Sequence, residues 1–106
     1  MKLGIVINTN DPEKAWNALR LGNTALKEQH EVSVFLMGAG VEIELLEDER
    51  YDARGALNTF LELKGNLMAC GTCLKSRQQE GGVCPVSTMI DLLKMIEVSD
   101  KVVTFG

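Results

Sequence analysis

Short apolar runs, separated by stretches of helical periodicity, constrain the fold of this chain more than any other feature. The first two runs, residues 3–7 and 32–37, are rich in β-branched side chains and contain almost no polar residue. Such runs are typical of strands buried on both faces of a parallel sheet. Two further runs, residues 66–70 and 101–105, predict a third and a fourth strand.

The segments between these runs predict helices. Asp11-Pro12-Glu13 is a typical helix start, because aspartate caps and proline suits the first helical position, and the apolar spacing continues to about residue 29. Residues 53–61 predict a second helix that stops at Gly65, and residues 72–79 a third. Residues 41–49 predict only a short helix or an irregular excursion. A fourth helix is expected after Ser87 as its cap, with an inward stripe formed by Met89, Leu92, Leu93 and Ile96.

Strands that alternate with helices predict βαβ units and an α/β fold. We expect one domain over residues 1–106: a flavodoxin-like three-layer αβα sandwich with a parallel sheet of about four strands in the order 2-1-3-4. Ligand crevices in such sheets lie beyond the carboxyl ends of the strands, where the strand order reverses. This rule predicts a crevice lined by Asn8, Thr9, Asn10, Gly38, Gly40, Gly71 and Thr72, next to the cysteines at positions 70 and 73.

Charge and composition exclude several classes of function. The 106-residue chain has a formal net charge of −4 and no cluster of Lys and Arg, so we expect neither a nucleic-acid nor a membrane partner. No apolar run approaches the roughly 20 residues that cross a bilayer, and the apolar start is too short for a signal peptide. Three cysteines are an odd number, which suits a reducing compartment. We therefore expect a cytoplasmic protein.

The cysteines are the candidate catalytic residues. Cys70 ends a predicted strand and precedes a helix, so backbone N–H groups should face its sulfur and stabilise the nucleophilic thiolate. Lys75 and Arg77 add positive charge to the same segment. Cys73 follows three residues later, and Cys84 lies beyond a glycine-rich stretch. Both are candidate partners of Cys70.

Three uses of these thiols compete. The first is persulfide or thiol chemistry on Cys70, with Cys73 or Cys84 as a resolving or relay partner. The second is a Cys70–Cys73 dithiol redox pair, although the order of elements around the motif differs from that of thioredoxin. The third is a zinc site, which three sulfurs do not complete. Because His30 is expected on the far side of the crevice, we expect neither a metal nor a cofactor.

The chain resembles the DsrE-like family, which includes the sulfur-relay proteins DsrE and TusD. The similarity lies in residues 2–8, in residues 34–41, in the Cys-Gly-Thr-Cys-Leu-Lys-Ser-Arg segment at residues 70–77, and in residues 92–105. It implies a flavodoxin-like fold and a homo-oligomer, either a trimer or a hexamer. It also implies that Cys70 carries sulfane sulfur as a persulfide, between donor and acceptor proteins. Roles for Cys73 and Cys84 are not part of that pattern.

The sequence thus predicts a sulfur-transfer protein that acts through Cys70. The alternative from another class is a non-catalytic oligomeric binding module, in which Cys70 would be unreactive.

Overall fold

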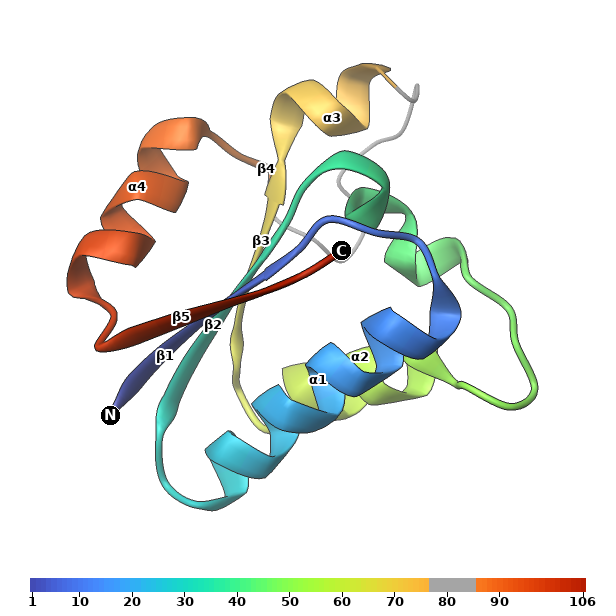
Figure 1. Cartoon of the computed structure of the whole chain (residues 1–106), viewed down its shortest axis with the longest axis horizontal. Helices are drawn as coiled ribbons and strands as arrows, with labels where there is room; N and C mark the ends of the chain where they lie inside the picture. The colour runs from blue at the N-terminus through green and yellow to red at the C-terminus, as the bar shows by residue number, and fades with distance from the viewer. Residues whose placement is uncertain (77–85) are drawn as a thin grey trace.

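The computed structural model describes residues 1–76 and 86–106 (Figure 1). In chain order the elements are β1 (Lys2–Ile7), α1 (Pro12–Lys27), β2 (Glu31–Leu36), the 3-10 helix η1 (Gly38–Leu45), α2 (Ala53–Glu62), β3 (Asn66–Cys70), α3 (Gly71–Ser76), β4 (Val86–Ser87), α4 (Met89–Val98) and β5 (Lys101–Phe105). No helix in the described part of the chain is long and apolar enough to cross a membrane.

The strands form one parallel sheet in the order β4-β3-β2-β1-β5. Ile5 at its centre pairs with Val34 on one side and Val103 on the other. The predicted α/β sandwich is therefore confirmed, whereas the predicted strand order 2-1-3-4 is wrong: β1 pairs with β2 and β5, and β2 separates it from β3. The short strand β4 also raises the strand count from four to five.

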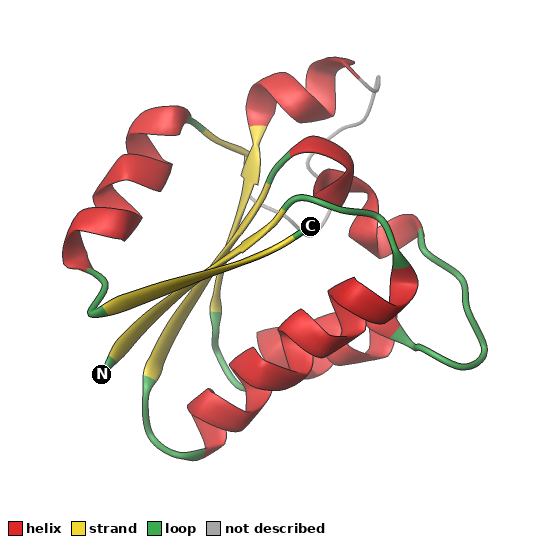
Figure 2. Cartoon of the chain, in the orientation of Figure 1, coloured by secondary structure: helices red, strands yellow, loops and turns green. Residues whose placement is uncertain are grey.

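The helices explain the observed order. α1 and α2 pack against each other on one face of the sheet, whereas α4 lies on the opposite face (Figure 2). The chain therefore steps from β1 to β2 to β3 in one direction, and α4 then returns it to the free edge of β1. Both orders can be built with right-handed crossovers. The choice depends on which face each helix covers, which strand periodicity does not encode.

The local signals for the first two long helices are confirmed. The Asp11 carboxylate caps α1 by accepting a 2.9 Å hydrogen bond from the Lys14 N–H, and Pro12 is the first helical residue. Asp52 caps α2 in the same way through the Gly55 N–H, also at 2.9 Å. The apolar stripes of both helices, among them Leu19, Leu57 and Phe60, are buried in the core with the strands.

The prediction for the fourth helix is wrong in two respects. Thr88, not Ser87, is the N-cap: its Oγ1 accepts the Asp91 N–H at 3.4 Å, and Asp91 Oδ2 accepts the Thr88 N–H at 2.8 Å. Ser87 instead belongs to β4 and is buried. Of the predicted stripe, Met89, Leu93 and Ile96 are exposed and Leu92 is half-buried, whereas Met95 faces the sheet. Much of the apolar surface of α4 is thus left outside this chain's core.

Candidate active site

The carboxyl ends of the central strands are tied together by backbone hydrogen bonds. The Asn8 N–H donates to the Phe105 carbonyl at 2.8 Å, which joins β1 to β5. The Met37 N–H donates to the Ile7 carbonyl at 3.1 Å, which joins the end of β2 to β1. Segments 8–10 and 38–40 therefore lie side by side at the edge of the sheet that the carboxyl ends of the strands form, as the sequence predicted.

Two glycines permit this close approach. Gly38 has a φ of +55°, a conformation that favours glycine, and a Cβ there would overlap Asn8 Oδ1. A Cβ at Gly40 would overlap the Ile7 carbonyl group. The Gly-Ala-Gly stretch is consequently explained by the packing of β2 and η1 against the end of β1.

Cys70 and Cys73 lie beside this edge, at the junction of β3 and α3. Both are thiols rather than half-cystines, and their side chains are in hydrogen-bonding contact. They differ in accessibility, because Cys70 is only 4% exposed whereas Cys73 is half-buried. The structure therefore brings the two predicted residues together but makes them unequal.

The sulfur of Cys73 also contacts the glycine segment. The Gly38 backbone N–H donates a 3.2 Å hydrogen bond to Cys73 Sγ. Sequence reasoning placed Gly38 and Cys73 near each other but did not predict this bond. It shows that the cysteine motif is held against the end of β2 through a specific backbone donor.

Burial raises the pKa of the Cys70 thiol, and a side-chain hydrogen bond with Cys73 raises it further. The backbone N–H groups of Cys73 and Thr72 act in the opposite direction, as predicted for a strand-to-helix turn. Their effect is smaller than that of burial. Burial thus opposes the thiolate that the strand-to-helix position of Cys70 predicts, and the pKa of this thiol lies above its usual value.

A hollow of about 360 Å³ adjoins Cys70. Its lining comprises Cys70, Gly71, Thr72, Val86, Ser87, Thr88 and Met89. The contribution of β4 and the start of α4 was missed in the sequence, because a two-residue strand leaves no periodicity to detect. The sulfur-bearing residue Cys70 therefore borders a hollow that is shared by β3, α3, β4 and the start of α4.

The other predicted residues are less closely connected with the thiols. Thr9 Oγ1 accepts the Asp11 N–H at 3.0 Å and so belongs to the turn before α1. Asn10 is exposed beyond β1. Arg77 and Cys84 lie outside the described residues, so their predicted roles stay predictions.

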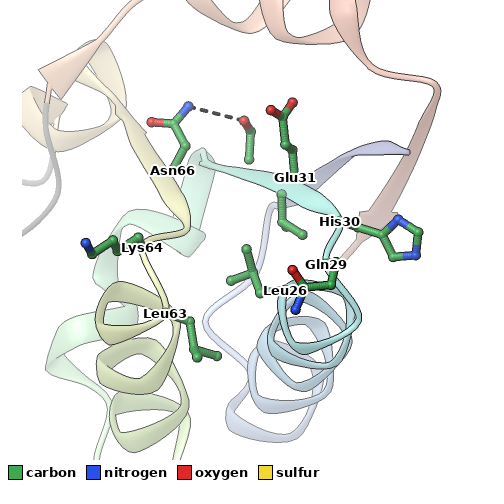
Figure 3. Close-up of a pocket in the computed structure, with 9 residues that line it drawn as sticks. Leu26, Gln29, His30, Glu31, Leu63, Lys64 and Asn66 are labelled. Atoms are coloured by element: carbon green, nitrogen blue, oxygen red, sulfur yellow. Dashed lines mark hydrogen bonds between the residues drawn. The ribbon is translucent and has the colours of Figure 1, made fainter.

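A larger hollow, of about 450 Å³, lies at the opposite edge of the sheet (Figure 3). It is formed around the amino ends of β2 and β3, where Asn66 Nδ2 donates to Ser33 Oγ at 3.2 Å. The His30 ring points away from the hollow, and its Nδ1 lies 2.8 Å from the Met1 amino group. His30 is thus remote from both cysteines, as predicted, and no cysteine lines this hollow.

Across the described residues, no three His, Cys, Asp or Glu side chains are grouped closely enough to hold a metal ion. The chemistry that the described part of the site offers is therefore that of two adjacent thiols and the backbone donors around them.

Comparisons with known proteins agree with the sequence motifs. The chain is 35% identical to the uncharacterized protein MJ0989 of Methanocaldococcus jannaschii, over 99% of this chain and 100% of that protein. It is 34% identical to the uncharacterized protein MK0008 of Methanopyrus kandleri, over 88% of this chain and 83% of that protein. The model of the DsrE/DsrF-like family matches residues 1–105. The chain belongs to the DsrE/DsrF-like family.

Proposed function

We propose that this protein is a sulfur-transfer protein in which Cys70 carries sulfane sulfur as a persulfide. The observation that supports the proposal most directly is the pair of contacting thiols, Cys70 and Cys73, at the carboxyl edge of the sheet in a DsrE/DsrF-like chain. Such chemistry needs reduced cysteines, so the proposed compartment is the cytoplasm. The proposed partners are a protein that donates the sulfur and a protein that accepts it.

The proposed reaction is an exchange without net oxidation. A cysteine thiolate attacks the outer sulfur of a donor persulfide; a new S–S bond forms on this protein, and the donor leaves as a thiolate. Delivery is the same step in reverse, with the acceptor's thiolate as the attacking group. The reaction needs positioned thiols but neither a metal nor a redox cofactor.

The surroundings of Cys70 suit storage of the sulfur. The 4% exposure of this residue would keep a persulfide away from competing thiols in solution. The backbone N–H groups of Thr72 and Cys73 face its sulfur and would stabilise the charge of a persulfide anion. The neighbouring hollow of about 360 Å³ leaves space for the additional sulfur atom.

The test is to incubate the reduced protein with a low-molecular-weight persulfide and map the added sulfur by mass spectrometry of peptides. We expect one added sulfur on Cys70 and its loss after treatment with a thiol acceptor. Cys70→Ser should not retain sulfur at position 70, whereas Ser76→Ala, in the same segment, should behave like the wild type. Absence of added sulfur on every cysteine would refute the proposal and favour a non-catalytic binding module.

A dithiol redox function is the second candidate, because the contact between the Cys70 and Cys73 side chains also suits disulfide formation. It would require a disulfide oxidant and a dithiol reductant as partners. Equilibration in glutathione buffers separates the two functions. A redox protein would show a reversible Cys70–Cys73 disulfide with a potential in the range of about −270 to −200 mV.

We also propose that the protein is a homo-oligomer, a trimer or a hexamer. The supporting observation is the apolar outer face of α4, where Ile90 is 64% and Leu93 55% exposed, alongside the exposed Met89, Ile96 and Val98. Contiguous apolar surface of this kind marks contact sites. A second copy of the chain is the proposed occupant, and this contact would lie next to β4 and the Cys70 hollow.

A further inference from the structure

We infer that Cys73, not Cys70, is the thiol that meets the protein that donates the sulfur and the protein that accepts it, and that Cys70 exchanges sulfur with these proteins only through Cys73. The inference rests on the proposed sulfur-transfer function and assigns the order in which its two thiols act. It reverses the expectation that the cysteine at the end of the strand is the one that partners attack.

Accessibility is the first argument. An S–S exchange requires three sulfur atoms nearly in line, so the attacked or attacking thiol must be reachable by a protein-bound sulfur. Cys70 is 4% exposed and faces Cys73, whereas Cys73 is half-buried and its neighbour Thr72 is exposed. A partner's cysteine can therefore approach Cys73 with less rearrangement than Cys70.

The hydrogen bonds around the two sulfurs provide the second argument. Cys73 Sγ accepts the Gly38 N–H at 3.2 Å. Donors that face a sulfur stabilise the negative charge that it carries when it attacks or leaves. Burial, in contrast, raises the pKa of the Cys70 thiol. The Gly38 N–H is thus placed to stabilise the charge on Cys73 when this sulfur attacks or leaves.

The internal step then follows the existing hydrogen bond. After loading, Cys73 carries the outer sulfur as a persulfide anion and Cys70 is a thiol. The Cys70 sulfur attacks the outer sulfur, so that a Cys70–sulfur bond forms and the Cys73–sulfur bond breaks. The Cys70 proton moves to Cys73, which leaves as a thiol held by the Gly38 N–H. The sulfane sulfur has moved from Cys73 to Cys70, and the step needs no oxidant or reductant.

The experiment compares two single variants in a Cys84→Ser reference protein, loaded with a protein-bound persulfide and quenched at short times. We expect Cys73→Ser to slow the appearance of sulfur on Cys70 by about tenfold or more. Cys70→Ser should instead accumulate persulfide on Cys73 at the reference rate. Cys73→Ala and Cys70→Ala serve as second variants if either serine impairs folding.

The unmodified protein provides an independent measurement. With a slow alkylating agent near neutral pH, Cys73 should be modified about tenfold faster than Cys70. Faster modification of Cys70 would overturn the inference.

The outcomes separate this inference from the proposed function. Reference-rate loading of Cys70 in Cys73→Ser, together with no sulfur on Cys73 in Cys70→Ser, would overturn the inference and leave the sulfur-transfer function intact. Loading of the wild type but not of the Cys84→Ser reference would also overturn it, because Cys84 would then be the entry thiol. No loading of any protein, including the wild type, would refute the proposed function itself.

Discussion

The backbone N–H of Gly38 and the sulfur of Cys73 are joined by a 3.2 Å hydrogen bond, which ties the end of β2 to α3. Gly38 reaches this position with a φ of +55° while lying against the Asn8 side chain. One residue thus connects the ends of β1 and β2 with the cysteine motif. Its backbone conformation should matter for both stability and thiol chemistry.

Gly38→Ala should lower the free energy of unfolding by about 1–3 kcal/mol, because alanine is strained at this φ and its Cβ would meet Asn8 Oδ1. Urea denaturation measures the change. The double variant Asn8→Ala/Gly38→Ala removes the clash but not the backbone strain, so it should recover part of the loss. If Gly38→Ala is as stable as the wild type, residue 38 neither requires a positive φ nor lies against the Asn8 side chain.

The raised pKa of Cys70 predicts how stability depends on pH. Above about pH 9 the unfolded chain releases the proton that the folded protein still holds on Cys70, so the folded state binds more protons there. The contribution of Cys70 to the free energy of unfolding is therefore fully present below about pH 9 and falls as pH rises through the folded-state pKa. Between pH 8 and pH 10, the slope of the free energy of unfolding against pH, measured by urea denaturation, should be less negative in Cys70→Ala than in the wild type. Identical slopes would show that the thiol ionises as it does in the unfolded chain.

Thr88→Ala should destabilise the protein by about 1 kcal/mol, because it removes the hydroxyl that accepts the Asp91 N–H at the start of α4. Thr88→Ser keeps that hydroxyl and is the matched control. Thermal unfolding followed by circular dichroism compares the three proteins. If serine and alanine cost the same, the methyl group rather than the cap is responsible.

The apolar face of α4 predicts how the oligomer can be dissociated. Leu93→Lys places a charge in the proposed contact, so it should shift the protein to a smaller species in light scattering coupled to size exclusion. Leu21→Lys, at a 40% exposed leucine of α1, is the control and should leave the mass unchanged. A wild type that is monomeric at micromolar concentrations would refute the oligomer.

The order in which the two thiols act predicts that Cys73→Ser affects loading from two kinds of sulfur donor differently. Cys73→Ser should impair loading from a protein-bound persulfide more than loading from a small persulfide, because a small donor can enter the hollow beside Cys70. The ratio of the two loading rates, measured by mass spectrometry, should change by about tenfold. An equal effect on both donors would mean that donor size does not govern access to Cys70.

Much of the fold is encoded in local patterns. The buried runs of β1 and β2 and the Asp11-Pro12 start of α1 each carry a physical requirement that depends on near neighbours in the chain. The same patterns predict that the ends of β1, β2 and β3 share an edge, because parallel strands place their carboxyl ends together. Hence the cysteines could be placed next to Gly38 before any tertiary structure was considered.

Tertiary packing determined the rest. Strand order depends on the face that each crossover helix covers, and the return of α4 to the free edge of β1 is not visible in the periodicity of either element. Inequality between the thiols arises in the same way: Cys70 and Cys73 are of one residue type, three positions apart, yet burial raises the pKa of Cys70 and Gly38 donates to Cys73. The accessibility and the hydrogen bonds of each sulfur depend on contacts with segments that are distant in the sequence. The sequence therefore identified the pair of thiols, and only the fold distinguished one from the other.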